Sequence, residues 1–275
     1  MKNTIKKLFF VSLAFNLLLI FFVMKSNMRE GVSANTPFYY KNQTYTMKTS
    51  NYDVFKTKQA NIVMLGDSIT YGVDWHELLG RQDIVNRGIG GDVTEGMLNR
   101  LYYVFKVKPK IVFLMGGIND IMSDYATPEK ITKNQKLIIE KLKKQNIKPV
   151  ITSTLYVSSS LNNYKSINAK VDKLNSLLKQ LAADQEIDYI DLNSKLANGT
   201  WMNSKYTIDG VHLLGNAYEI WGAEISKILA NSETLFLDQS VDDTTNRENK
   251  NSNEQLSSTE NITQNQSDEG RYLKF

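Results

Sequence analysis

The chain contains no cysteine and only two histidines, His76 and His212, among its 275 residues. The absence of cysteine excludes disulfide bonds, a thiolate nucleophile and cysteine-ligated zinc. Two histidines without cysteine leave no recognisable ligand spacing for a metal site, so we expect neither a metal nor another cofactor. The chain also lacks a strong excess of either charge, since 33 Lys and Arg stand against 29 Asp and Glu and the formal net charge is +4. The middle of the chain is too mildly basic to indicate nucleic-acid binding.

The N-terminus carries a long apolar run. Lys6 and Lys7 precede residues 8–24, and Lys25 closes the run. About 17 apolar residues are near the lower limit for crossing a bilayer, and lysines ahead of the run predict that the N-terminus stays inside. We therefore expect residues 1–30 to form an uncleaved signal anchor, with the rest of the chain extracellular. The alternative is a signal peptide cleaved near Val32-Ser33-Ala34, which would release a secreted protein.

Composition divides the remainder into three parts. Residues 31–60 are polar and rich in tyrosine, without clear periodicity, and we expect them to form a connector that wraps onto the domain. Residues 61–237 hold the globular domain. Residues 238–275 are dominated by Asn, Ser, Thr, Gln and acidic side chains, which cannot bury enough apolar surface to offset the entropy of ordering, so we expect a disordered tail.

The domain alternates short apolar runs with amphipathic stretches. This alternation predicts a parallel sheet covered by helices on both faces. Five such units fit an α/β, three-layer, flavodoxin-like, doubly wound fold with a five-stranded parallel sheet. The expected strands are 61–65, 84–86, 111–115, 150–153 and 189–192, and the expected helices are 75–79, 94–105, 128–145, 168–183 and 215–229.

Short glycine-containing segments follow the expected strands. In an open α/β sheet the ligand site lies at the carboxyl ends of the strands, so these segments should meet at one edge. They are Gly66-Asp67-Ser68-Ile69, Gly90-Gly91-Asp92, Gly117-Ile118-Asn119-Asp120 and Asp209-Gly210-Val211-His212.

Ser68, Asp209 and His212 together predict nucleophilic catalysis. A serine hydroxyl is a weak nucleophile until a base takes its proton. Asp209 precedes His212 by three residues, and a turn at that spacing can place the carboxylate against the imidazole and leave Nε2 free for Ser68. The other histidine, His76, lies in what looks like a short helix, and we interpret it as a partly exposed helix residue.

The order and spacing of the four segments resemble the SGNH hydrolase superfamily, also called the GDSL esterases and lipases. The resemblance is strongest to the branch related to platelet-activating-factor acetylhydrolase, and it extends from Ile62 to Leu213. Ile69 stands where the family name has leucine, and both side chains are apolar. The resemblance implies the doubly wound fold and a catalytic triad of Ser68, His212 and Asp209.

Donors for an oxyanion are available in three of the segments. The tetrahedral intermediate of acyl transfer needs preorganised donors where its negative charge forms. Ser68 offers its backbone N–H and Asn119 offers its side-chain NH2. The resemblance selects Gly91 over Gly88 and Gly90, because in the family the glycine directly before the aspartate of this segment is the donor.

A dinucleotide-binding loop is the competing interpretation of Gly88-Ile89-Gly90-Gly91. The third glycine of that fingerprint would fall at Val93, and the segment follows the second strand, not the first. We therefore favour the hydrolase interpretation.

The sequence predicts a membrane-anchored or secreted extracellular serine esterase that hydrolyses short acyl esters through an acyl-enzyme, with O-acetylated glycans as one substrate class. Two alternatives stay open. One is a lipolytic enzyme of the lysophospholipase or thioesterase type, and the other is a surface-anchored binding module that has lost turnover. Transfer of the acyl group to a sugar instead of water also stays open. The polar residues 155–164 could form a flexible loop beside the site, which favours sugar over a long acyl chain.

Overall fold

A computed structural model describes residues 37–232 of the chain. The expected signal anchor or signal peptide and the expected C-terminal tail lie outside the described residues. Within residues 37–232, no helix has both the length and the apolar character that a membrane crossing requires.

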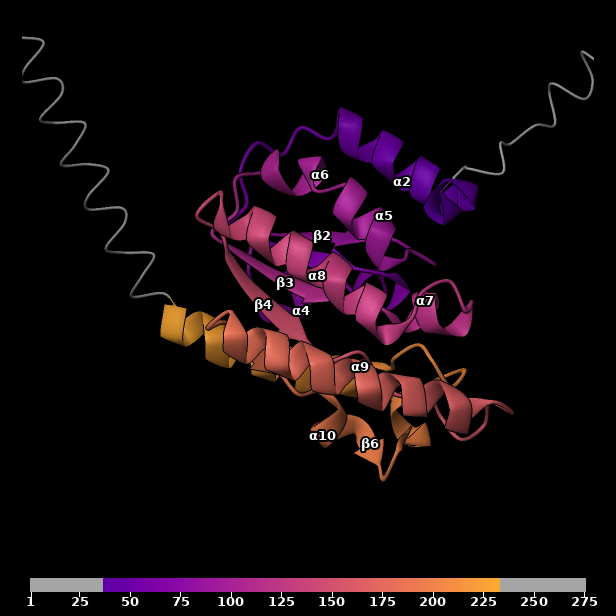
Figure 1. Ribbon diagram of the computed structural model, residues 1–275. Helices are drawn as coiled ribbons and strands as arrows, with labels where there is room; N and C mark the ends of the chain where they lie inside the picture. The colour runs from indigo at the N-terminus through magenta and orange to yellow at the C-terminus, as the bar shows by residue number, and fades with distance from the viewer. Residues whose placement is uncertain (1–36, 233–275) are drawn as a thin grey trace, which may run out of the picture.

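A parallel sheet of five strands forms the centre of the molecule (Figure 1). Its order is β2-β1-β3-β4-β5, which confirms the doubly wound α/β fold that the sequence predicts. Strands β1 and β3 are buried along their whole length, which explains why they read as continuous apolar runs. The strands are β1 (Ile62–Gly66), β2 (Ile84–Gly88), β3 (Ile111–Met115), β4 (Lys148–Thr152) and β5 (Asp188–Ile190).

Helices cover both faces of this sheet. On one face, α5 (Thr94–Asn99), α8 (Pro128–Lys143) and α9 (Tyr164–Asp184) lie side by side in front of the strands in Figure 1. Behind the strands lies α4 (Trp75–Leu79), which packs against a helix over residues 215–232. The short elements at the edges are α3 (Ser68–Tyr71), α6 (Tyr102–Phe105), α7 (Ile118–Met122), α10 (Asn193–Leu196), β6 (Ala197–Asn198), β7 (Trp201–Met202) and η2 (Ser204–Tyr206).

Alternate side chains of β1 enter the two halves of the core. Val63 and Leu65 are fully buried in a cluster that contains Met97 of α5. Ile62 and Met64 enter the other cluster, where the rings of Trp75 and Trp221 meet edge to face with centroids 4.8 Å apart. The period-two alternation of a strand therefore builds two separate apolar layers.

The part of the expected connector that the structure describes contains a helix that the sequence pattern did not show. The 3-10 helix η1 (Phe38–Lys41) leads into α2 (Gln43–Val54), which lies outside α5 and α6 (Figure 1). Within α2 only Tyr45 and Tyr52 are buried, so the segment has too few core positions to reveal a helical period in the sequence.

The register of the sheet aligns the ends of three strands. Gly66 at the end of β1 pairs with Gly88 of β2 on one side and with Met115 of β3 on the other. The loops that follow these strands therefore leave the sheet at the same edge.

Candidate active site

Ser68 lies directly beyond the end of β1. Asp67 caps the short helix α3, because its Oδ1 accepts a hydrogen bond from the Ile69 N–H at 3.0 Å. Gly66 must be glycine here, since a Cβ at this position would lie 2.0 Å from Thr70 Oγ1 and 2.6 Å from the Met115 carbonyl oxygen. The tight turn places the Ser68 hydroxyl at the edge of the sheet.

His212 bridges Ser68 and Asp209. Its Nε2 lies 2.9 Å from Ser68 Oγ, and its Nδ1 lies 2.6 Å from Asp209 Oδ2. A carboxylate can only accept, so Nδ1 carries the proton and donates it to Asp209. Nε2 is then the acceptor, and the Ser68 hydroxyl donates to it. The structure thus brings together the three residues that the sequence analysis selected as a triad.

Asp209 is held as a carboxylate by the loop that contains it. Its Oδ1 accepts from the backbone N–H groups of Val211 and His212 at 2.9 and 2.8 Å. Partial burial raises the pKa of Asp209, but the hydrogen bonds from the His212 ring and from these two N–H groups outweigh it and lower the pKa to about 2.

The loop over residues 207–212 is also supported from outside. The Gly210 carbonyl accepts the Ser158 N–H at 2.8 Å, and the Gly210 N–H donates to Thr207 Oγ1 at 3.0 Å. Ser158 belongs to the polar residues 155–164 and is buried, with 3% of its surface exposed. Part of that segment therefore packs directly behind the Asp209–His212 turn.

Asn119 contacts the loop that contains Gly91. Its Nδ2 donates to the Asp92 carbonyl at 2.9 Å from the first turn of α7. Because an amide NH2 has two hydrogens, this bond uses one and leaves the other available. Gly91 is exposed and has a left-handed backbone with φ of +69°. Gly91 follows β2 and Asn119 follows β3, as the sequence analysis expected, and these two strands flank β1.

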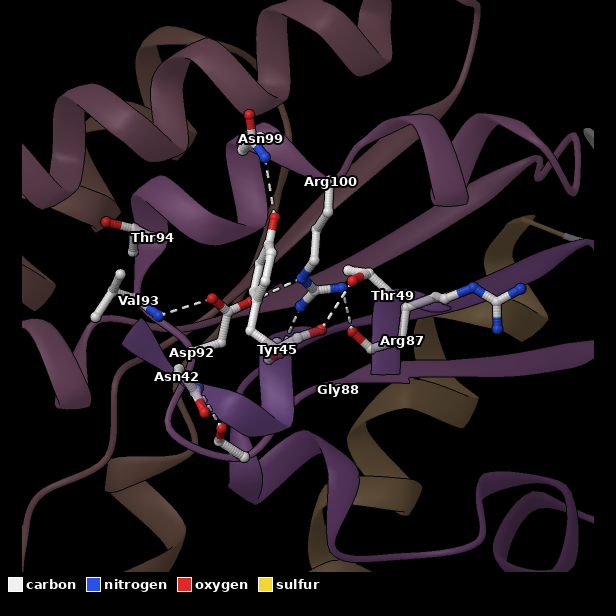
Figure 2. Close-up of polar contacts among 12 residues, drawn as sticks. Asn42, Tyr45, Thr49, Arg87, Gly88, Asp92, Val93, Thr94, Asn99 and Arg100 are labelled. Carbon is white, nitrogen blue, oxygen red and sulfur yellow. Dashed lines mark hydrogen bonds and ion pairs between the residues drawn. The ribbon is translucent and has the colours of Figure 1, made fainter. Parts of the chain in front are cut away.

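A buried arginine links these loops to the sheet (Figure 2). Arg100 Nε binds Asp92 Oδ2 at 2.7 Å, and its two terminal nitrogens donate to the carbonyls of Arg87 and Gly66 at 2.7 and 2.9 Å. Burial raises the pKa of Asp92, and the Arg100 guanidinium opposes that rise. One side chain thus joins the end of β1 to the loop after β2.

Two further carboxyl groups are buried near Ser68. Burial, with Asp92 and Asp120 nearby, raises the pKa of Asp67 to about 7, although the Ile69 N–H and the His212 ring oppose it. Burial also raises the pKa of Asp120 to about 6, against hydrogen bonds from the N–H and hydroxyl of Thr94. The site is therefore built over carboxyls that resist ionisation.

His76 takes no part in this arrangement. Its Nδ1 lies 3.1 Å from Asp74 Oδ1 on α4, and its side chain is 40% exposed. Among residues 37–232, no group of three or more acidic or histidine side chains is placed to hold a metal ion.

A family model with the description GDSL-like lipase/acylhydrolase matches residues 64–220. The chain belongs to this family. The family is one of lipases and acylhydrolases, and the match contains all four segments that the sequence analysis identified.

Known relatives of this GDSL-like hydrolase include two kinds of curated protein. An N-acylneuraminate cytidylyltransferase of Streptococcus agalactiae is 24% identical over 67% of this chain and 42% of its own length. The chain thus spans less than half of that relative. Platelet-activating factor acetylhydrolase IB subunit alpha2 of Rattus norvegicus is 27% identical over 59% of this chain and 73% of its own.

Solved structures support the fold of this family member. A GDSL-like lipase from Bacteroides thetaiotaomicron aligns over 68% of this chain and 98% of its own, with a TM-score of 0.61 and 23% identity. At this identity the similarity establishes the fold.

Sequence analysis of this GDSL-like hydrolase missed Arg100. The signal was present, because Arg100 follows Met97 by three residues and precedes Val104 by four on an apolar helical face. A charged side chain at a core position indicates a buried partner.

Proposed function

We propose that the chain is a serine esterase in which Ser68 is the nucleophile, His212 the general base and Asp209 the residue that orients the imidazole. The observation that carries the proposal is the continuous hydrogen-bonded line from Ser68 Oγ to His212 Nε2 and from His212 Nδ1 to Asp209 Oδ2, at 2.9 and 2.6 Å. A serine is activated when a base lies within hydrogen-bond reach of its hydroxyl and a third group orients that base.

In acylation, Ser68 Oγ attacks the ester carbonyl carbon while its proton moves to His212 Nε2. The resulting imidazolium is stabilised by the Asp209 carboxylate, whose pKa of about 2 keeps it ionised across the physiological range. His212 then gives the proton to the departing alcohol oxygen as the carbon–oxygen bond breaks. Ser68 is left carrying the acyl group as an ester.

The carbonyl oxygen gains a negative charge during the attack. We assign its stabilisation to the N–H groups of Ser68 and Gly91 and to the Asn119 side-chain NH2. The second Nδ2 hydrogen of Asn119 supports this role, because the first is fixed on the Asp92 carbonyl at 2.9 Å. Each such donor contributes about 2.7 to 4 kcal/mol to lowering the barrier.

Water completes the cycle. The side chains of His212 and Asp209 are 45% and 50% exposed, so solvent reaches Nε2 once the alcohol has left. His212 takes a proton from water, the hydroxide attacks the acyl-enzyme, and Ser68 leaves with the proton returned by His212. This open rim supports hydrolysis as the outcome.

The acyl group that we propose is acetyl, carried by an O-acetylated glycan. An acetylhydrolase subunit at 27% identity supports a short acyl group, and a relative named for an acylated sugar supports a carbohydrate. We further propose that the domain acts outside the cell, because the apolar run behind Lys6 and Lys7 is typical of a signal anchor or signal peptide.

A lipolytic substrate is the second candidate. Two exposed apolar side chains favour it, because Ile208 is 76% exposed four residues before His212 and Tyr71 is 48% exposed one helical turn after Ser68. An exposed apolar rim at a catalytic edge is suited to an acyl chain.

A chain-length series separates these candidates. The full-length protein would be assayed with p-nitrophenyl esters from acetate to octanoate, and with O-acetylated polysaccharide by release of free acetate. We expect Ser68-dependent acetate release and rates that fall as the acyl chain lengthens. Rates that rise towards octanoate, with no acetate release, would favour the lipolytic function. Equal activity of Ser68→Ala would contradict the serine mechanism.

A further inference from the structure

The segment Phe38–Val54 packs against the loop that contains Gly91. It lies outside residues 64–220, which match the family model. Tyr39, Tyr45 and Tyr52 of the segment form one buried cluster with Ile89 and Val93, which lie on either side of the Gly90–Asp92 turn. The segment therefore packs behind the loop that contains Gly91.

Asn42, labelled in Figure 2, makes a hydrogen bond at each end of its side-chain amide. Its Oδ1 accepts from the Thr44 N–H at 3.0 Å, which caps α2. Its Nδ2 donates to the Gly90 carbonyl at 2.8 Å. The first bond holds the amide in one orientation, so the second points a fixed donor at the Gly90 carbonyl.

The Gly90 carbonyl and the Gly91 N–H belong to the same peptide unit. That unit is planar and trans, so its N–H bond and its C=O bond point in opposite directions. A bond that fixes the direction of the Gly90 carbonyl therefore fixes the direction of the Gly91 N–H. It also polarises the peptide and strengthens the N–H as a donor.

A turn bond from the Asp92 N–H to the Ile89 carbonyl at 3.2 Å spans this peptide, and Asn42 adds a side-chain bond to its carbonyl. Two adjacent glycines give it wide conformational freedom, and Gly91 already has φ of +69°. A Cβ at Gly91 would lie 3.3 Å from Asn42 Nδ2, so Asn42 closely approaches the position. The next residue is fixed independently, because Asp92 binds both Arg100 and Asn119.

Helix α2 is held firmly enough to serve as a support. Tyr52 donates its hydroxyl to the Gly88 carbonyl at 3.2 Å, and its ring lies 4.7 Å below the Arg87 guanidinium. Tyr45 accepts from Asn99 Nδ2 at 3.0 Å, which joins α2 to α5 (Figure 2). Asn42 thus acts from a helix that is bound at several points to β2 and α5.

We propose that Asn42 is a positioning residue of the esterase, an inference that rests on the proposed function. By binding the Gly90 carbonyl, its amide holds the Gly91 N–H towards the oxyanion of the tetrahedral intermediate. The extension before the family domain thereby completes the oxyanion hole.

The test compares Asn42→Asp with Asn42→Ser in the full chain. Both replacements are good helix caps, so both keep α2. An ionised aspartate has no donor, and the serine side chain is shorter than that of asparagine, so its hydroxyl does not reach the Gly90 carbonyl. The serine variant adds no charge, which separates loss of the donor from repulsion by a carboxylate. We expect kcat for p-nitrophenyl acetate to fall roughly 10-fold or more in both, below the 10²- to 10³-fold loss of a whole oxyanion donor, with KM within about twofold.

A transition-state analogue provides a readout that a purely structural role would not move. In a trifluoromethyl ketone, Ser68 Oγ adds to the carbonyl carbon, its proton passes to His212, and the carbonyl oxygen becomes an oxyanion. The affinity of each Asn42 variant for this ketone should fall by the same factor as its kcat/KM. An unchanged affinity beside a reduced kcat/KM would overturn the proposal.

Tyr45→Phe is the matched control. It removes the bond to Asn99 and so weakens the same helix, but it leaves Asn42 in place. We expect its kcat to stay within about twofold of the parent. An equal loss in Tyr45→Phe, or an unchanged kcat in both Asn42 variants, would overturn the role of Asn42. Hydrolysis that survives in Ser68→Ala would instead refute the proposed function, so the two failures are distinguishable.

Discussion

The guanidinium of Arg100 binds the carboxylate of Asp92 at 2.7 Å, and neither side chain is exposed to solvent. Its remaining nitrogens donate to the carbonyls of Arg87 and Gly66, so all three contacts lie in the site segments or within three residues of them. A buried ion pair with these additional bonds fixes one geometry between two loops. Removing one member leaves the other charge buried without a partner.

Arg100→Met should therefore lower the free energy of unfolding by about 3–5 kcal/mol. Arg100→Lys should lower it less but still measurably, because one ammonium cannot replace a planar fork that serves three acceptors. Guanidinium unfolding curves measure both. The control is Arg81→Met, since Arg81 pairs with Asp83 while both side chains are about 30% exposed, and a surface pair is worth about 0–1 kcal/mol. Equal losses at the two arginines would contradict the argument.

Ser68→Ala and His212→Ala should each lower kcat roughly 10³-fold or more, and the double variant should lose little beyond either single one. The reason is that the hydroxyl and the imidazole at 2.9 Å act as one unit. Steady-state rates with p-nitrophenyl acetate provide the test.

His76→Ala is the matched control for His212, because His76 also pairs with an aspartate but lies on α4. It should retain the parental kcat. Multiplicative losses in the double variant, or a large loss at His76, would contradict the triad assignment.

The raised pKa of Asp67 makes the free energy of unfolding fall as pH rises. Its folded pKa of about 7 lies above its ordinary value of 3.8, so its contribution to the free energy of unfolding is complete below pH 3.8 and is lost as pH rises through 7. Between these values the unfolded chain releases a proton that the folded chain retains. Asp67→Asn removes this loss, so the stability of the variant relative to the parent should rise from pH 5 to pH 8.

The size of this effect is bounded by one proton, or up to about 1.4 kcal/mol per pH unit. Thermal melts at several pH values measure it. Asp83→Asn serves as the control of opposite sign, because the hydrogen bond from Arg81 lowers the pKa of Asp83 against partial burial. The loss of stability of Asp83→Asn relative to the parent should therefore shrink as pH falls. A constant difference between Asp67→Asn and the parent from pH 5 to 8 would contradict the raised pKa.

Much of the fold could be predicted because the strands are buried on both faces. Residues 111–115 read as a continuous apolar run and form β3 with those bounds. The positions of Ser68, Asp209 and His212 could be predicted because motif order and strand ends give the same edge. The side-chain contacts at this edge could not be predicted from the sequence and are known only from the structure.

Elements stabilised by polar or aromatic contacts could not be predicted in the same way. The expected helix 94–105 is divided into α5 and α6 at Arg100, whose buried guanidinium is aimed at Asp92 while its backbone leaves helical geometry. Helix α9 begins at Tyr164, ahead of the expected 168. Asn168 lies on its buried face because it bonds the backbone of Val157 and Thr200. A pattern of apolar residues cannot predict such hydrogen-bond partners.

Gly210→Ala should lower both stability and turnover. Gly210 has φ of +93°, and a Cβ there would lie 2.2 Å from Leu161 Cδ1 and 2.9 Å from Ser160 Oγ. The left-handed backbone alone costs an alanine roughly 1–2 kcal/mol, and overpacking adds about 1–3 kcal/mol. The displaced turn contains Asp209 and His212, so the 2.9 Å contact from His212 to Ser68 should lengthen and kcat should fall.

Gly80→Ala separates the backbone cost from the packing cost. Gly80 also has a left-handed backbone, with φ of +62°, but a Cβ there would meet no atom within 4 Å. This variant should lose only roughly 1–2 kcal/mol in guanidinium unfolding and keep the parental kcat, because it ends α4 away from Ser68. If Gly210→Ala kept the parental kcat as well, the contact of residues 158–161 with the Asp209–His212 turn would not position the base. If it lost activity while Gly80→Ala did not, that contact would be established as a support of the site.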